Sequence, residues 1–340
     1  SRGPPVERRL TTCAVDPEQF FAASRLVIVA GKGGVGKTTV SATLARAAAL
    51  AGLSTLIVEV EGKSGLTAMF GQGELGYDEV VLSPGGGPDG AGDVRARTLT
   101  ADAALLEYLR DHGLSRVSKR LVSTGALDVV ATAAPGIKDI LLLGKVKQLE
   151  RAGTADMIVL DAPAAGHAIT FLQSARSLID TVNVGPINAQ ARDVLELLED
   201  HERCQVMLVT IPEETPVNEA VETAFSLEDR VGIGLGPVVV NGVYPRIEGL
   251  TADPAAVTAA ADRAEVALRE GEADVLAAAA GFRLDRTALQ AEQVGRLEAH
   301  LPLPQLRLPF LFTTDIGPVE VDGLARALLS EIEALTRLPA

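Results

Sequence analysis

Short, mainly apolar runs alternate along the chain with longer segments rich in Ala and Leu. These runs lie at residues 26–30, 54–60, 156–161, 206–211, 237–241 and 306–311, and a further short strand is expected at 94–98, where Val and Ala alternate with Arg. Runs of this kind are typical of buried parallel strands, and the segments between them are long enough for crossover helices. The pattern therefore predicts an α/β fold, with a doubly wound, mainly parallel sheet covered by helices.

Two helical segments interrupt this alternation. Residues 101–153 contain helical patterns without an intervening strand, and residues 252–300 are rich in Ala and Glu with a predicted break near Gly281. We expect residues 25–340 to form one domain, with the first segment as a helical insertion. This insertion forms either a client surface or an ordinary packed layer. The second segment is expected to be a helical hairpin of the outer layer or the rim of a dimer, and residues 1–24 a flexible N-terminal segment.

The first apolar run leads directly into a glycine-rich loop. Its sequence is Gly31-Lys32-Gly33-Gly34-Val35-Gly36-Lys37-Thr38-Thr39. A strand, such a loop and then a helix is the context that a phosphate-binding loop (P-loop) requires, because backbone N–H groups turn inward around the phosphates. Lys37 is placed to reach the β and γ phosphates and the Thr38 hydroxyl to bind Mg²⁺. The loop predicts ATP or GTP chemistry.

Acidic side chains end two of the predicted strands. The run at 156–161 ends in Asp161, and small residues and Gly166 follow it. A carboxylate there can hold Mg²⁺ through water, and the following loop can sense the γ phosphate. The run at 54–60 continues into Glu61 after the acidic Glu59. Carboxyl ends of parallel strands form the ligand edge of such a sheet, so these carboxylates are expected near the P-loop.

Charge and composition exclude several classes of function. The formal net charge is -14, which argues against nonspecific binding to nucleic acid or to anionic lipid. The two cysteines, Cys13 and Cys204, match no metal spacing, which favours a reducing compartment. We find no stretch of about 18 apolar residues and predict a cytoplasmic protein without an integral membrane segment.

Lys32, directly after the first loop glycine, distinguishes this loop from an ordinary P-loop. GKGGVGKT resembles the deviant P-loop of the arsenite-transporting and tail-anchored-protein-targeting ATPases, especially their bacterial branch, and the resemblance spans residues 25–335. It implies an ATPase that uses ATP and Mg²⁺ and works as a dimer, with Lys32 reaching the partner's nucleotide. Glu61 falls where relatives carry an aspartate that orients the attacking water.

The resemblance also implies roles for residues far from the loop. The segment from Asp161 through Gly166 resembles the family's second switch. Glu219 falls on a glutamate that contacts nucleotide across the dimer, and Asn241 on the asparagine that recognises adenine. Pro309 and Phe310 would lie in the second wall of the adenine pocket.

The departures from the family leave alternatives open. Glu61 replaces an aspartate, and Ala164-Ala165 stands where relatives have Pro-Thr. The zinc-binding CxxC and the arsenite-binding cysteines of relatives are absent. We therefore expect an ATP-driven switch, a homodimer or a hetero-dimer with a paralogue, acting on a hydrophobic protein or an anion. The alternatives are a weakly hydrolysing regulatory subunit of a hetero-dimer and, against the charge argument, a partition or septum-positioning ATPase.

Overall fold

A nine-stranded sheet forms the centre of the chain. The computed structural model describes residues 15–60, 65–86, 90–111, 136–163, 165–181 and 185–335. The strands follow the order β3-β4-β2-β5-β1-β6-β8-β9, with β7 paired to β6, and within these described ranges only the β3–β4 pair is antiparallel. Their bounds are β1 (Leu26–Gly31), β2 (Thr55–Val60), β3 (Val80–Ser83), β4 (Val94–Leu99), β5 (Met157–Asp161), β6 (Cys204–Thr210), β7 (Gly234–Leu235), β8 (Val238–Val243) and β9 (Gln305–Pro309). This arrangement confirms the predicted α/β fold.

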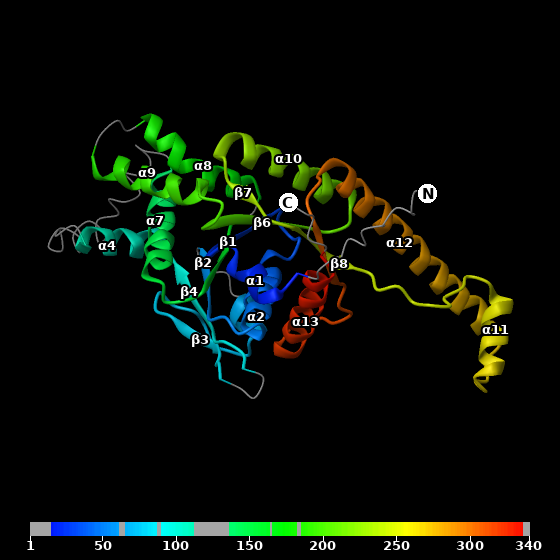
Figure 1. Ribbon diagram of the computed structural model, residues 1–340. Coiled ribbons are helices and arrows are strands. Elements are labelled where there is room, and N and C mark those ends of the chain that lie inside the picture. Colours follow the sequence, from blue (N-terminus) through cyan, green and yellow to red (C-terminus); the bar gives the residue numbers. More distant parts are fainter. Residues whose placement is uncertain are drawn as a thin grey trace, which may run out of the picture.

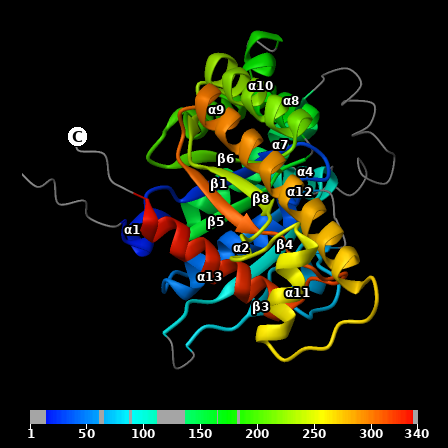
Figure 2. The same cartoon turned by 90° about the vertical axis from the view of Figure 1, so that its right-hand side faces the viewer.

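Helices cover both faces of the sheet, as Figures 1 and 2 show. On one face lie α1 (Pro17–Ala22), α2 (Lys37–Leu50), α3 (Gly65–Met69) and α13 (Pro318–Ala334). On the other lie α7 (Ile137–Ala152), α8 (Ala165–Thr181), α9 (Pro186–Glu199) and α10 (Glu214–Val231), with α4 (Ala101–Asp111) against α7. Alternate residues of β1 enter the two cores, because successive strand side chains point to opposite faces. Burial of a strand on both faces explains why most of these runs are mainly apolar.

The described part of the helical insertion is a packed layer. Helices α4 and α7 confirm helix at both ends of the predicted segment, and Ile140, Leu143 and Val146 of α7 are buried in the core. The middle of the predicted helical segment, residues 112–135, lies outside the described residues. Near the N-terminus, α1 buries Phe21 to 2% exposure against α2 and α13, so the expected flexible segment does not extend to residue 24.

The predicted outer hairpin is present, but its break lies elsewhere. Helix α11 (Pro254–Arg263) is followed by α12 (Glu272–His300), which runs without interruption through Gly281. The prediction of a break there was wrong. A Cβ at Gly281 would lie 3.5 Å from the Cβ of Ala252, an ordinary van der Waals separation. The helix continues through this position because one glycine costs a helix only about 1 kcal/mol relative to alanine. Among the described helices, none has the length and apolar character needed to cross a membrane.

Candidate functional site

The P-loop connects β1 to α2 and depends on its glycines. Gly34 and Gly36 have φ angles of +87° and +89°, in the left-handed region that side chains other than glycine adopt at a cost. A Cβ at Gly36 would lie 2.3 Å from Nδ2 of Asn241, and one at Gly31 would lie 2.3 Å from the Val209 carbonyl oxygen. The loop is therefore wedged between β6 and the end of β8, and its conformation needs glycine at these positions.

Lys37 is held against the loop. It begins α2, its side chain is 7% exposed, and its Nζ donates a hydrogen bond to the backbone oxygen of Lys32 at 3.1 Å. The ammonium therefore lies within the curve of the loop that carries the glycine N–H groups. A cation and a set of backbone donors in one place form an anion site.

The two predicted Mg²⁺ ligands lie in contact with each other. Thr38 Oγ1 donates a hydrogen bond to Asp161 Oδ2 at 2.7 Å, and Asp161 is fully buried at the end of β5. Hydroxyl and carboxylate oxygens are the ligands that Mg²⁺ prefers, so this donor pair fits the metal that accompanies a nucleotide. The contact joins the P-loop to the predicted second switch across two adjacent strands.

Two further side chains lie at this edge: Ser41, which was not predicted, and Glu59, which was expected near the P-loop but given no role there. Ser41 lies one turn after Thr38 on α2, and its Oγ lies 3.4 Å from Asp161 Oδ1. Glu59, 1% exposed, stands beside Asp161 in the β2–β5 register and accepts a hydrogen bond from Thr98 Oγ1 at 3.1 Å. The available signals were a serine three residues after Thr38 and an acidic residue within an apolar strand.

Lys32 and Glu219 form an ion pair within the single chain. Lys32 Nζ lies 2.6 Å from Glu219 Oε1, and the two side chains are 38% and 37% exposed. The family resemblance assigns both residues to the partner's nucleotide, and the structure brings them to one place, 187 positions apart in sequence. An ion pair this exposed stabilises a protein by only about 0–1 kcal/mol. Lys32 can therefore exchange partners at little energetic cost.

The predicted adenine-side residues lie at the ends of β8 and β9. Asn241 donates from Nδ2 to the Val35 carbonyl oxygen at 3.0 Å, which ties β8 to the P-loop. Pro309 pairs with Val243 in the sheet, and the Phe310 backbone N–H donates to the Val243 carbonyl oxygen at 2.8 Å. The Phe310 ring is 39% exposed, as a base-stacking surface requires.

An aromatic cluster adjoins Phe310 and was not predicted. The ring centroids of Tyr244 and Phe312 lie 5.0 Å and 4.9 Å from that of Phe310. The Arg283 guanidinium of α12 stacks over the Tyr244 ring at 4.1 Å. We define Tyr244, Phe310, Phe312 and Arg283 as the aromatic cluster. Only the three-dimensional structure joins them, since they come from three separate segments.

The other predicted site residues lie in the loop or in the first turn of a helix, apart from Glu61. Gly33 and Val35 belong to the loop, Thr39 lies in the first turn of α2, and Gly166 lies in the first turn of α8. Glu61 lies outside the described residues. The structure thus brings together the P-loop, Asp161, Lys32, Glu219 and Asn241 at one edge of the sheet. The position of Glu61 relative to them stays a prediction.

The chain is similar in sequence to several ATPases. A family model for anion-transporting ATPases matches residues 24–184, which include the P-loop and Asp161. ATPase BagA of Mycobacterium tuberculosis is 35% identical over 228 residues, covering 65% of this chain and 66% of that protein. A putative arsenical pump-driving ATPase of Halobacterium salinarum is 28% identical over 245 residues, covering 66% of this chain and 36% of that protein. ATPase get3 of Neurospora crassa is 27% identical over 150 residues, covering 44% of this chain and 42% of that protein.

Proposed function

Because the chain belongs to the ArsA family of anion-transporting ATPases, we propose that it is a Mg²⁺-dependent ATPase that acts as a nucleotide-driven dimeric switch. The observation that carries the proposal is the 2.7 Å contact between Thr38 of the P-loop and Asp161 at the end of β5. It supports a nucleotide and metal site at the edge where the loop, the strand-end carboxylate and Asn241 converge.

Binding of the nucleotide is assigned to residues of one subunit. Loop N–H groups and Lys37 would hold the phosphates, and Thr38 and Asp161 would hold Mg²⁺, which supplies charge neutralisation when bound. Asn241 would face the adenine, since an amide both donates and accepts hydrogen bonds, and Phe310 would supply the stacking surface. Glu61 would orient the attacking water, a role that rests on the family resemblance alone.

We assign to Lys32 the role of coupling ATP hydrolysis to assembly of the dimer. Its side chain would leave Glu219 and reach the phosphates on the partner subunit, bringing a cation to the charge that develops during phosphoryl transfer. The partly exposed ion pair supports this exchange, because the free energy lost when it breaks is small compared with that of a charge-assisted hydrogen bond to phosphate. Hydrolysis would then depend on dimer formation, and release of phosphate would return Lys32 to Glu219.

Complementation between two inactive variants tests the proposal. Lys37→Ala removes ATP binding in a subunit that still carries Lys32, and Lys32→Ala keeps ATP binding in a subunit without the assembly lysine. Each variant alone is expected to lose turnover, and an equimolar mixture is expected to recover part of it. A mixture as inactive as its components, in a parent protein that turns over ATP, would contradict action across the dimer.

A second function is favoured by one feature of the sequence. Glu61 is longer by one methylene than the aspartate of relatives, and misplacement of a catalytic group by about an ångström can reduce a rate on the order of a hundredfold. The chain would then be a nucleotide-binding regulatory subunit whose active partner is a paralogue. Tight ATP binding without turnover by the purified chain would support this candidate.

The described part of the helical insertion bears on the client. The buried apolar residues of α7 favour a packed layer over an exposed client surface for the described part of the helical insertion. A cavity of about 420 Å³ between α4, α7 and α9 has a mixed lining that includes Lys145, Arg151 and Glu107. Such a lining does not select for an apolar peptide, and a protein or anion client stays a proposal.

A further inference from the structure

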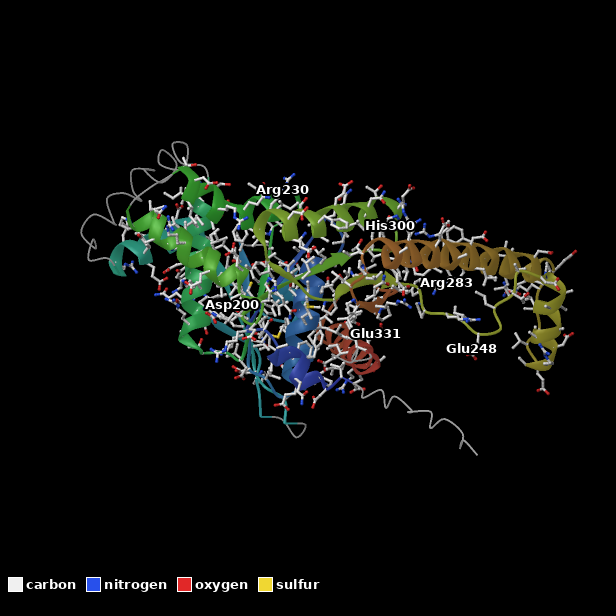
Figure 3. The ribbon with its side chains drawn as sticks, turned by 45° about the horizontal axis from the view of Figure 1, so that its top comes forward. Asp200, Arg230, Glu248, Arg283, His300 and Glu331 are labelled. Carbon is white, nitrogen blue, oxygen red and sulfur yellow. The ribbon has the colours of Figure 1, made fainter. Side chains whose placement is uncertain are left out.

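Helices α11 and α12 form an arm that extends beyond the sheet and its helical layers (Figure 1). Helix α12 has 29 residues, and its C-terminal half is anchored on the body by the buried side chains of Gln290, Val294 and Leu297. Its N-terminal half carries α11, and Figure 3 shows Arg283 partway along α12 and His300 at the end nearer the body. The arm thus presents a helix surface away from the core.

One face of the arm is apolar and exposed. Val275, Phe282 and Leu289 are 68%, 69% and 53% exposed. They recur every seven residues, so they share one side of the helix, and we call this row the seam. Ala277 and Ala280 are buried on a different side. Large apolar side chains at every seventh position supply one of the two positions in each heptad through which one helix packs against another.

The base of the arm is fixed to the edge that carries the nucleotide site. Arg283 donates to the Pro245 carbonyl oxygen at 3.0 Å and stacks on the aromatic cluster. The Gln290 side chain accepts from the Tyr244 N–H at 2.8 Å and donates to the Gly242 carbonyl oxygen at 3.1 Å. Gly242 directly follows Asn241, which contacts the P-loop. The arm therefore leaves the body from the edge at which Lys32 would meet a partner.

We propose that the seam packs against the same seam of a second copy of this chain, with the two α12 helices antiparallel. In an antiparallel pair centred on Phe282, the two Phe282 side chains meet and Val275 of each copy faces Leu289 of the other. Ala278 and Ala279 lie between Val275 and Phe282 on this side, and Asp285 and Arg286 lie between Phe282 and Leu289. In the centred antiparallel pair, the two alanines of each copy face Arg286 and Asp285 of the other, so they leave room for these longer side chains. Acidic residues outnumber basic ones along the arm, which disfavours a nucleic acid or an anionic membrane as the occupant.

The seam is too small to hold a dimer together by itself. A stable interface buries about 1,200–2,000 Å² in total, and a phenylalanine about 150–250 Å², so three side chains from each copy fall short of a dimer on their own. The seam adds to an interface at the nucleotide edge, and the inference rests on the ATP-bound dimer proposed above. It makes the arm a second contact between the subunits, distinct from Lys32.

Cysteine cross-linking tests the geometry. In a Cys13→Ser background, with Cys204 buried and left in place, Phe282→Cys is expected to form a disulfide-linked dimer under mild oxidation with Mg²⁺ and ATP. Val275→Cys and Leu289→Cys are each expected to stay unlinked alone and to link when mixed. Ala288→Cys, exposed on a different side of α12, is the matched control and is expected to stay unlinked.

A second variant measures strength without cross-linking. Phe282→Asp is expected to raise the dimer dissociation constant on the order of a hundredfold, because one buried aromatic is lost from each copy. Its ATP affinity as a monomer is expected to equal that of the parent, since Phe282 lies outside the nucleotide site. Ala288→Asp is the control for adding a carboxylate to α12.

The outcomes separate the inference from the proposed function. Dimerisation driven by ATP without a Phe282→Cys cross-link overturns the seam and leaves the function standing. A Phe282→Cys cross-link that forms equally without ATP upholds the seam and contradicts the switch. A chain that stays monomeric in every condition and forms no cross-link overturns the inference.

Discussion

Replacing Gly36 by alanine is expected to destabilise the protein more than the same change at Gly34. Both residues lie in the P-loop with nearly equal positive φ angles, +89° and +87°. An alanine in the left-handed region costs about 1–2 kcal/mol. Nothing lies within 4 Å of a Cβ at Gly34, so this backbone term is the whole expected cost there.

A steric term is added at Gly36. The new Cβ would lie 2.3 Å from Nδ2 of Asn241, so the amide must move and give up its 3.0 Å hydrogen bond to Val35. Loss of a hydrogen bond that leaves a buried group unsatisfied costs about 1–3 kcal/mol. We therefore expect Gly36→Ala to lower the free energy of unfolding by about 2–5 kcal/mol, the sum of this loss and the backbone term.

Urea unfolding of the full chain measures both variants and a double-mutant cycle. Asn241→Ala removes the clashing amide, so in that background Gly36→Ala is expected to cost no more than Gly34→Ala. Equal costs at Gly34 and Gly36 in the parent would refute the reasoning, as would a Gly36→Ala cost that Asn241→Ala leaves unchanged.

Three further predictions concern single residues. Asp161→Asn is expected to lower the apparent Mg²⁺ affinity about 10–100-fold, measured by Mg²⁺ titration of ATP turnover; unchanged affinity would exclude Asp161 from the metal site. The hydroxyl and backbone N–H of Ser54 donate to Asp156 and lower the pKa of its carboxyl below the ordinary value of 3.8. The stabilisation by the ionised carboxylate is full at neutral pH and is lost as pH falls through the lowered pKa. Asp156→Ala should therefore lower the free energy of unfolding at pH 7 and lower it progressively less in acid. A difference between variant and parent in urea unfolding that does not change with pH would contradict this. Burial raises the pKa of the Cys204 thiol, so a thiol reagent should label it only after unfolding, and native labelling would contradict its burial.

The sequence predicted those parts of the site that are contiguous or mark a strand end. The P-loop carries its own signature, because glycine spacing, Lys37 and Thr38 are local requirements of one turn. Asp161 was identifiable because an apolar run ended in a carboxylate, and its contact with Thr38 follows from adjacent parallel strands. Most of the strands were predictable because burial on both faces favours apolar residues, although β2 and β4 also bury the polar side chains of Glu59 and Arg97.

Contacts between distant segments could not be predicted in this way. The Lys32–Glu219 ion pair and the Asn241–Val35 hydrogen bond join residues 187 and 206 positions apart, and no local pattern encodes such distances. Helix α12 continues through Gly281, because a single glycine costs a helix only about 1 kcal/mol and does not by itself end it. The arm's seam is apolar at helical spacing, and sequence cannot distinguish such a row from a buried face.

The most direct measurement is ATP turnover of the purified full chain as a function of its concentration, together with its mass in solution with and without Mg²⁺ and ATP. If Lys32 acts on the partner's nucleotide, turnover per subunit rises with protein concentration, and ATP shifts the mass from monomer to dimer. Turnover per subunit that is constant over the same range, in a chain that stays monomeric with ATP bound, would contradict the dimeric switch.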